Sequence, residues 1–250
     1  MSDEYEVLLR LVDDNRRAWG NGDARPTDWV YPTSFWRPGI DQIAAQQIVN
    51  LESGPTPPGR YWLAVSIFNP ATGQLLPVTA GSSDSPDTFF IGPLKVPLSQ
   101  PLPDAVQHLS QQVANFGDSI QLLGFALEPE TAAPGESIQV QLLWQAETTP
   151  ETDYTVFIHL LDENNALVTG SDAQPLNGTY PTSIWTSGEQ VFDPHTLTLP
   201  NNLAPGQYRL AIGLYHQPTG QRLPLITANG QPDSQKQLLL DQPINVQAAQ

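Results

Sequence analysis

The stretch PGRYWLAVSIFNPATGQLLPV at residues 58–78 recurs as PGQYRLAIGLYHQPTGQRLPL at residues 205–225. In the second copy, Tyr208, Leu210 and Ile212 alternate with side chains of the other face, which is the period of a strand with one face on a core. A Pro-Gly turn precedes each copy of the strand, and a turn containing Thr-Gly follows it. The stretch therefore predicts a duplicated β-strand bounded by tight turns.

The duplication extends toward the N-terminus. Tyr5–Gly39 aligns with Tyr154–Gly188 without a gap, and the match includes YPTSFW at 31–36 and YPTSIW at 180–185. Extended self-similarity of this kind is the signature of a repeated structural unit.

Composition favours short strands in both units. The 250 residues include 25 Pro and 18 Gly, and only 14 % are charged. We therefore expect an all-β chain of tandem immunoglobulin/fibronectin-III-like antiparallel β-sandwiches. The expected domains are residues 1–97, a linker at 98–116, and residues 117–250.

The two units begin differently. The second has two further strand candidates, SIQLLGFAL at 119–127 and ESIQVQLLWQ at 137–145, whereas the first starts at Tyr5 with four residues before it. The first sandwich is thus expected to lack its N-terminal strands, either because the chain was cut within a domain or because another chain supplies them. Residues 97–116 are expected to cover part of the gap or to act as a linker, and the open strands to allow self-association.

Three aromatic residues are predicted to be structural. Tyr61 and Tyr208 each open a strand after a Pro-Gly turn, as in the tyrosine corner of immunoglobulin-like sandwiches. Trp144 falls on the inward side of an alternating strand, so we expect it in the core.

The charge distribution excludes some partners. The formal net charge is −16, so nucleic acid and anionic lipid surfaces would be repelled. The absence of cysteine excludes disulfides and thiol catalysis. The acidic start of the chain lacks the features of a signal peptide, and no apolar run is long enough to cross a membrane.

Catalytic signatures are missing from the sequence. It contains no HExxH, GxSxG, GxxxxGK[ST] or GxGxxG pattern. The acidic clusters at 13–15 and 162–165 are interpreted as turns rather than calcium sites, and the four histidines as solvated residues. We therefore expect no enzyme activity, cofactor or metal. A pair of carboxylates for glycoside hydrolysis stays open as an alternative, because their separation is spatial.

Candidate ligand contacts lie in the repeated YPTSxW blocks: Tyr31, Trp36, Tyr180 and Trp185. Two interpretations compete. The aromatic rings can contact a cell-surface glycan or a protein, or the blocks can be loops that the shared fold requires. The second is favoured, because most other matched positions are turns and inward strand residues.

The second unit resembles a known module through FGDSIQLLGFAL, APGESIQVQLLWQ, DYTVFIHLLDENNALVTGSDAQP, YPTSIW and LAPGQYRLAIGLYHQPTGQRLPL. The module is a β-sandwich of bacterial membrane proteins of the dolichyl-phosphate-mannose–protein mannosyltransferase type, where it follows the multi-helix portion. The resemblance spans residues 117–246, with a truncated copy at 5–96. It implies an extracytoplasmic appendage of a membrane-anchored, glycan-handling protein. No activity is assigned to the module, so no catalytic residue is carried over.

These observations lead to three functional hypotheses. The favoured one is a non-catalytic spacer, or an appendage that binds glycan or protein. The alternatives are a glycan-active hydrolase with a carboxylate pair in a sandwich cleft, and a purely structural stalk.

Overall fold

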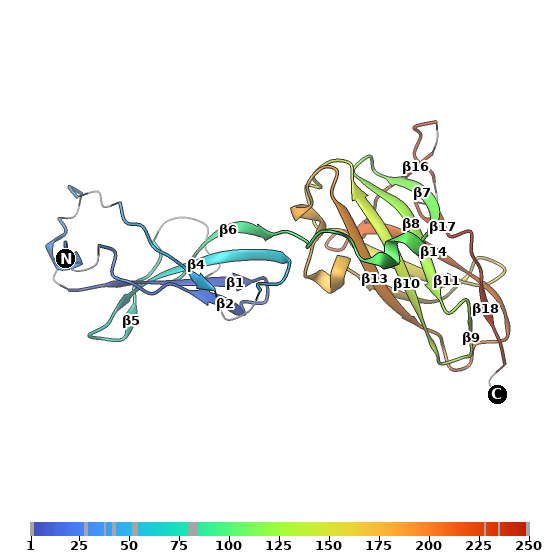
Figure 1. The fold of residues 1–250 in the computed structure, drawn as a ribbon, viewed down its shortest axis with the longest axis horizontal. Coiled ribbons are helices and arrows are strands. Elements are labelled where there is room, and N and C mark those ends of the chain that lie inside the picture. The colour runs from blue at the N-terminus through green and yellow to red at the C-terminus, as the bar shows by residue number, and fades with distance from the viewer. Residues whose placement is uncertain are drawn as a thin grey trace. The chain divides into compact units, whose positions relative to one another are not determined.

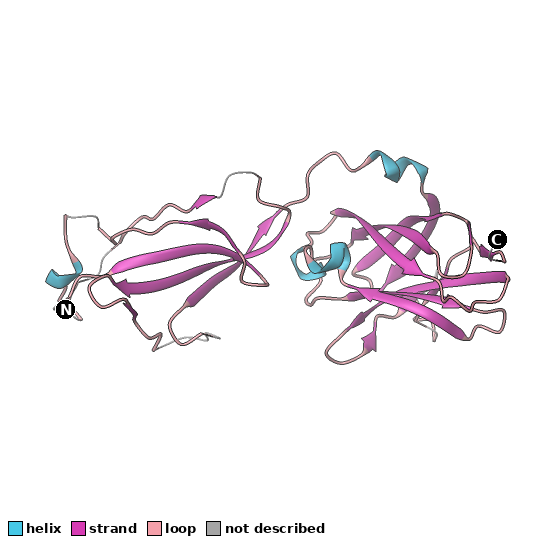
Figure 2. Ribbon diagram, turned by 90° about the horizontal axis from the view of Figure 1, so that it is seen from below, coloured by secondary structure: helices cyan, strands magenta, loops and turns pink. Residues whose placement is uncertain are grey.

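The computed structural model describes residues 3–27, 30–37, 39–41, 44–51, 55–79, 85–227, 229–234 and 236–248. The chain divides into two compact units, Met1–Pro97 and Leu98–Gln250. Both are built of mainly antiparallel strands joined by turns and short 3-10 helices, with one parallel pair, β9 with β18, in the second unit, so the all-β fold class is confirmed (Figures 1 and 2). Among the described residues, no helix has the length and apolar character needed to span a membrane.

The second unit is a complete β-sandwich of two sheets. The first sheet has the order β13-β10-β8-β7-β16, and the second has the order β12-β11-β14-β18-β9, with β15 and β17 also paired to β14. The strands of the first sheet are β7 (Ser110–Phe116), β8 (Ile120–Glu128), β10 (Ser137–Ala146), β13 (Gln190–Thr198) and β16 (Leu225–Ile226). Those of the second are β9 (Thr131–Ala132), β11 (Thr155–Leu161), β12 (Leu167–Ala173), β14 (Gly206–His216), β15 (Gln221–Arg222), β17 (Leu238–Leu239) and β18 (Ile244–Val246).

Alternating side chains from both sheets meet in one core. Ile138, Val140 and Leu142 of β10 are completely buried, and so are Leu210 and Ile212 of β14. Burying an aliphatic side chain contributes roughly 1.5–3 kcal/mol. The period-2 pattern of the sequence therefore determines which face of each sheet turns inward.

The first unit consists of one sheet. Its order is β3-β2-β1-β4-β5, and β6 also pairs with β4. The strands are β1 (Glu6–Asp13), β2 (Ala18–Asn21), β3 (Asn50–Leu51), β4 (Gly59–Asn69), β5 (Gln74–Leu75) and β6 (Phe89–Val96). In the part of this unit that the structure describes, no strands correspond to β8 and β10, as the repeat predicts.

This single sheet reproduces one sheet of the second unit, register included. Leu9 of β1 pairs with Val65 of β4, and their repeat equivalents Ile158 and Ile212 pair in the same way. The strand β6 takes the place of β17 and β18, because Gly59 pairs with Val96 as Gly206 pairs with Val246. The duplication is therefore a duplication of sheet topology as well as of sequence.

Residues 98–116 do not form the expected linker. Ser110–Phe116 is the strand β7, which pairs with β8, and Phe116 is completely buried in the second core. Leu98 also packs against that core, and the 3-10 helix η2 (Asp104–His108) lies between. The interpretation of 97–116 as a cover for the first unit is wrong, because its apolar residues complete the second sandwich.

The segment after the YPTSxW block differs between the units. In the second unit it forms β13, which pairs with β10 along nine residue positions. In the first unit the described residues between 37 and 51 form only the two-residue strand β3, which pairs with β2. A strand like β13 needs a neighbour like β10, and the first sheet has none among its described residues.

Candidate functional site

The YPTSIW block of the second unit lies inside its core. Tyr180 and Trp185 have no exposed surface, and the indole Nε1 of Trp185 donates to the backbone oxygen of Tyr180 at 3.1 Å. The hydroxyl of Tyr180 donates to Glu189. A ligand cannot reach either ring, so the ligand-contact interpretation is wrong for these two residues, and they act in packing.

The same block fixes where the chain enters the sheet. The backbone nitrogen of Tyr154 donates to Thr182 Oγ1 at 2.8 Å, and this hydroxyl donates to the backbone oxygen of Thr152 at 2.8 Å. In the first unit, Tyr5 donates to Thr33 Oγ1 at 2.8 Å, and Thr33 donates to Asp3 at 3.2 Å. The 3-10 helices η1 (Thr33–Phe35) and η4 (Thr182–Ile184) therefore serve one architectural purpose in both units.

The first copy of the block is less covered. Trp36 Nε1 donates to the backbone oxygen of Tyr31 at 3.1 Å, as in the second copy, but both rings are only partly buried. Phe35 is 68 % exposed, whereas Ile184 at the equivalent position is 7 % exposed. Tyr31 and Trp36 are thus accessible for contact, although their hydrogen bonds are those of the packed copy.

An ionic cluster supports this loop in the first unit. Arg37 donates to both carboxylate oxygens of Asp41, and the hydroxyl of Tyr31 donates to the same carboxylate at 2.9 Å. The guanidinium holds the pKa of Asp41 well below its usual range, and Asp41 in turn raises the pKa of Tyr31.

The residues predicted to be structural occupy structural positions. The hydroxyl of Tyr208 donates to the backbone oxygen of Ala204 at 2.9 Å, and that of Tyr61 donates to Pro57 at 2.7 Å. Both bonds have the form of a tyrosine corner. Trp144 is completely buried, as its place in the alternation requires.

A buried polar cluster centred on Asp193 was not predicted from the sequence. Its carboxyl group accepts hydrogen bonds from Trp144 Nε1 at 3.1 Å and from the backbone nitrogen of Leu176 at 2.9 Å, and it lies 2.7 Å from His195 Nε2. Asp193 has no exposed surface and His195 is 5 % exposed, so the expectation of a solvated histidine is wrong here. The signal was present, because Val191, Asp193 and His195 share one face of the alternating strand β13.

The open face is the name we give to the inner side of the first sheet. Its cross-strand rows join β1, β4 and β6, because Leu9 pairs with Val65 and Val65 with Phe89. Its members are all apolar or aromatic: Val7, Leu9, Leu11, Tyr61, Leu63, Val65, Ile67, Phe89, Ile91 and Leu94. The apolar rows cross three strands and end at Asp13, which pairs with Tyr61; Leu9 and Tyr61 are buried, and the other members are partly or fully exposed.

The repeat provides a matched comparison for this face. Ile67 is 42 % exposed and Leu94 is 43 % exposed, whereas Leu214 and Ile244 at the equivalent positions are completely buried. Ile91 is 47 % exposed and Phe89 is 40 % exposed. The cause of the difference is the second sheet of the sandwich, which covers the face in one unit and has no counterpart in the described part of the other.

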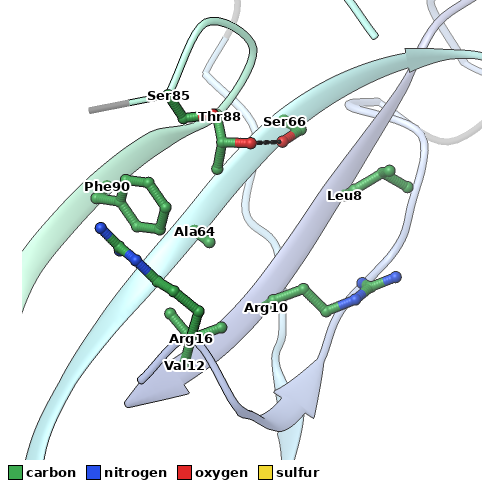
Figure 3. Close-up of a pocket in the computed structure, with 9 residues that line it drawn as sticks. All are labelled: Leu8, Arg10, Val12, Arg16, Ala64, Ser66, Ser85, Thr88 and Phe90. Carbon is green, nitrogen blue, oxygen red and sulfur yellow. Dashed lines mark hydrogen bonds between the residues drawn. The ribbon is translucent and has the colours of Figure 1, made fainter. Parts of the chain in front are cut away.

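The opposite side of the first sheet carries a cavity of about 370 Å³ (Figure 3). Leu8, Val12 and Ala64 contribute its apolar surface, and Figure 3 shows the side chain of Arg16 reaching across Val12 toward Phe90. The guanidinium carbon of Arg16 lies 3.8 Å from the centre of the Phe90 ring, a cation–π contact.

The second unit has a smaller cavity of about 270 Å³ on the equivalent side. Here Phe157 stands in place of Leu8 and occupies part of the space. His159 lies 3.7 Å from Asp172, in the same place as the ion pair between Arg10 and Asp23. Each outer cavity is therefore lined by a basic residue, Arg10 or His159, that has a carboxylate neighbour at an equivalent repeat position.

These pairs perturb the groups within them. Arg10 lowers the pKa of Asp23, and burial lowers the pKa of His159 despite the nearby Asp172. The carboxylates are thus engaged by basic side chains of their own sheets. Among the described residues, no group of three His, Asp or Glu side chains is arranged to hold a metal ion.

No protein-family model and no curated protein sequence matches the chain. One similar solved structure is an alkylpurine DNA glycosylase of Pseudomonas fluorescens bound to DNA with an abasic-site analogue, at 11 % identity and TM-score 0.31, covering 44 % of this chain and 29 % of that one. Another is the CARDB domain of a Pyrococcus furiosus protein in complex with di-metal ions, at 10 % identity and TM-score 0.27, covering 58 % and 99 %. Likenesses this distant transfer no property to the chain.

Proposed function

We propose that the chain is a non-catalytic binding region of an extracytoplasmic, membrane-anchored protein, and that its first unit docks another polypeptide. The observation that carries the proposal is the open face, where Ile67 and Leu94 are exposed although Leu214 and Ile244 at the equivalent positions of the second unit are completely buried. Contiguous apolar surface of this kind is characteristic of protein interaction sites. The extracytoplasmic position and the link to a glycan-handling membrane protein rest on the resemblance of the second unit.

A polypeptide fits the open face better than a glycan does. Four of the twelve large hydrophobic side chains that are exposed in the described residues lie on the open face: Ile67, Phe89, Ile91 and Leu94. Their number favours a partner that buries apolar area, since sugar sites combine one or two aromatic platforms with polar groups. The second unit offers no matching aromatic site, because Tyr180 and Trp185 are enclosed in its core.

The test is photo-crosslinking of the protein in the cells that produce it. A photoreactive benzoylphenylalanine replaces Ile91 on the open face, and in a control it replaces Leu167, which is 60 % exposed in the second unit. We expect a discrete protein adduct at position 91 and none at position 167. Equal adducts at both positions, or none at either, would contradict the docking function.

A glycan array completes the test. Glycan binding by the wild type that disappears in Trp36→Ala, with the fold intact, would replace polypeptide docking by glycan binding. We expect no such binding.

A further inference from the structure

We infer that the open face is completed by a β-hairpin of a partner polypeptide, which supplies strands equivalent to β8 and β10. The inference rests on the proposed docking function and names the partner's chemistry. In the second unit, the sheet containing these strands covers the equivalent face, and β10 presents Ile138, Val140 and Leu142 toward it. The partner strands must therefore have the same alternation of apolar inward and polar outward side chains.

The first unit keeps the geometry that the hairpin would need. Thr33 ties Asp3 to Tyr5 with the same two hydrogen bonds by which Thr182 ties Thr152 to Tyr154. The registers of β1 with β4 and of β11 with β14 also agree. The sheet is thus already in the arrangement that a covering sheet meets in the second unit.

A second feature of the first unit indicates that the partner contributes a strand and not only an apolar surface. In the second unit, β13 pairs with β10, whereas the described residues between 37 and 49 of the first unit belong to no strand. Within that segment Ile48 is 70 % exposed. A partner strand like β10 would provide both the missing cover and the ladder that this segment lacks.

This feature argues against a second copy of the chain as the occupant. In the first sheet, β2 lies between β1 and β3, β1 lies between β2 and β4, and β4 pairs with β1, β5 and β6. A second copy could cover the face with its own open face, but β1, β2 and β4 have neighbours on both sides, and β6, which among the described strands pairs with β4 alone, is a single strand rather than a free hairpin. The donor is therefore a chain with an uncommitted hairpin.

The experiment supplies the hairpin covalently to the full chain. A copy of residues 117–151 replaces Met1 and Ser2 directly before Asp3, because Asp3 and Thr152 are equivalent hydrogen-bond acceptors. A matched control carries Ile138→Ser, Val140→Ser and Leu142→Ser in the added copy only. The readouts are the unfolding temperature of the first unit, amide hydrogen exchange, and sedimentation velocity.

We expect the apolar hairpin to raise the unfolding temperature of the first unit by about 10 °C or more over the control. It should also slow exchange at β1, β4 and residues 44–51. Equal unfolding temperatures and equal exchange rates in the two fusions would overturn the inference. A wild-type dimer that Ile91→Ser dissociates would also overturn it, since the occupant would then be a second copy.

Failure of the inference differs from failure of the docking function. A protein adduct at position 91, combined with fusions that behave alike, leaves docking standing and removes the hairpin. Protection by the apolar hairpin without any adduct at position 91 removes docking by a partner chain.

Discussion

Asp193 connects three segments of the second sandwich through one buried carboxyl group. It contacts Trp144 of β10, His195 of its own strand β13, and the backbone of Leu176 in the 3-10 helix η3 (Pro175–Gly178). Such networks stabilise a fold when every member has a partner and are costly when one is removed. The cluster is enclosed in the core, so its contribution is to folding.

Replacing Asp193 tests this contribution. Asp193→Ala leaves the buried donors of Trp144 and Leu176 without an acceptor, and each such donor costs about 1–3 kcal/mol. We expect the free energy of unfolding of the second unit to fall by about 3 kcal/mol, measured by denaturant titration. The control Asp241→Ala removes an exposed carboxylate and should change stability by less than about 0.5 kcal/mol. Similar losses in both variants would show that the cluster is not a network.

The lowered pKa of His159 predicts that the second unit loses stability in mild acid. Burial lowers the pKa of this histidine, so the folded state binds this proton less readily than the unfolded chain. The resulting stability is present above the unfolded pKa of about 6.5 and is lost as pH falls toward the folded pKa. We expect the unfolding temperature of the second unit to drop between pH 7 and pH 5, and the drop to be smaller in His159→Gln. An equal drop in both proteins would assign the acid sensitivity to other groups.

The repeated YPTSxW loops are structural in both units, but their tryptophan side chains are buried to different extents. Trp185 is completely buried, while Trp36 makes the same backbone hydrogen bond and stays partly exposed. Trp185→Ala should cost the second unit about 3–5 kcal/mol of unfolding free energy. Trp36→Ala should cost the first unit about 1–2 kcal/mol, because less area is uncovered. Separate unfolding transitions followed by hydrogen exchange give both values, and equal costs would contradict the difference in cover.

The strands themselves could be predicted from the sequence to a large extent. The alternation in 58–78, 137–145 and 205–225 indicated β4, β10 and β14, and the repeat indicated which strands the first unit lacks. The strand β7 was missed because SQQVANF has few apolar residues, and its strand character comes from pairing with β8. The short β3 could not be foreseen, since the same part of the repeat becomes β13 when a neighbour like β10 is present.

The candidate site was less predictable than the fold. The YPTSxW aromatics were candidate ligand contacts because they recur in both units. Their recurrence reflects a requirement of the fold instead, because Tyr180 and Trp185 are buried in the core. The open face could not be assigned from the sequence, because its residues have the same apolar pattern as their buried equivalents. Only the absence of a covering sheet distinguishes Ile67 from Leu214.

The molecule combines a closed sandwich with an open copy of one of its sheets. Residues 1–97 contain eleven acidic and seven basic side chains and residues 98–250 contain fifteen and three, so the net charges are 7 − 11 = −4 and 3 − 15 = −12. A strongly acidic unit resists nonspecific association, whereas the open face of the less charged unit is left to bind.

Photo-crosslinking at Ile91, compared with Leu167, tests whether the open face binds a polypeptide. A discrete protein adduct at position 91, absent at position 167 and lost when the fused apolar hairpin occupies the open face, is the predicted result. An adduct at position 91 that persists at the same yield in a fusion whose apolar hairpin slows exchange at β1 and β4, or no adduct at either position, would contradict the docking of a polypeptide on the open face.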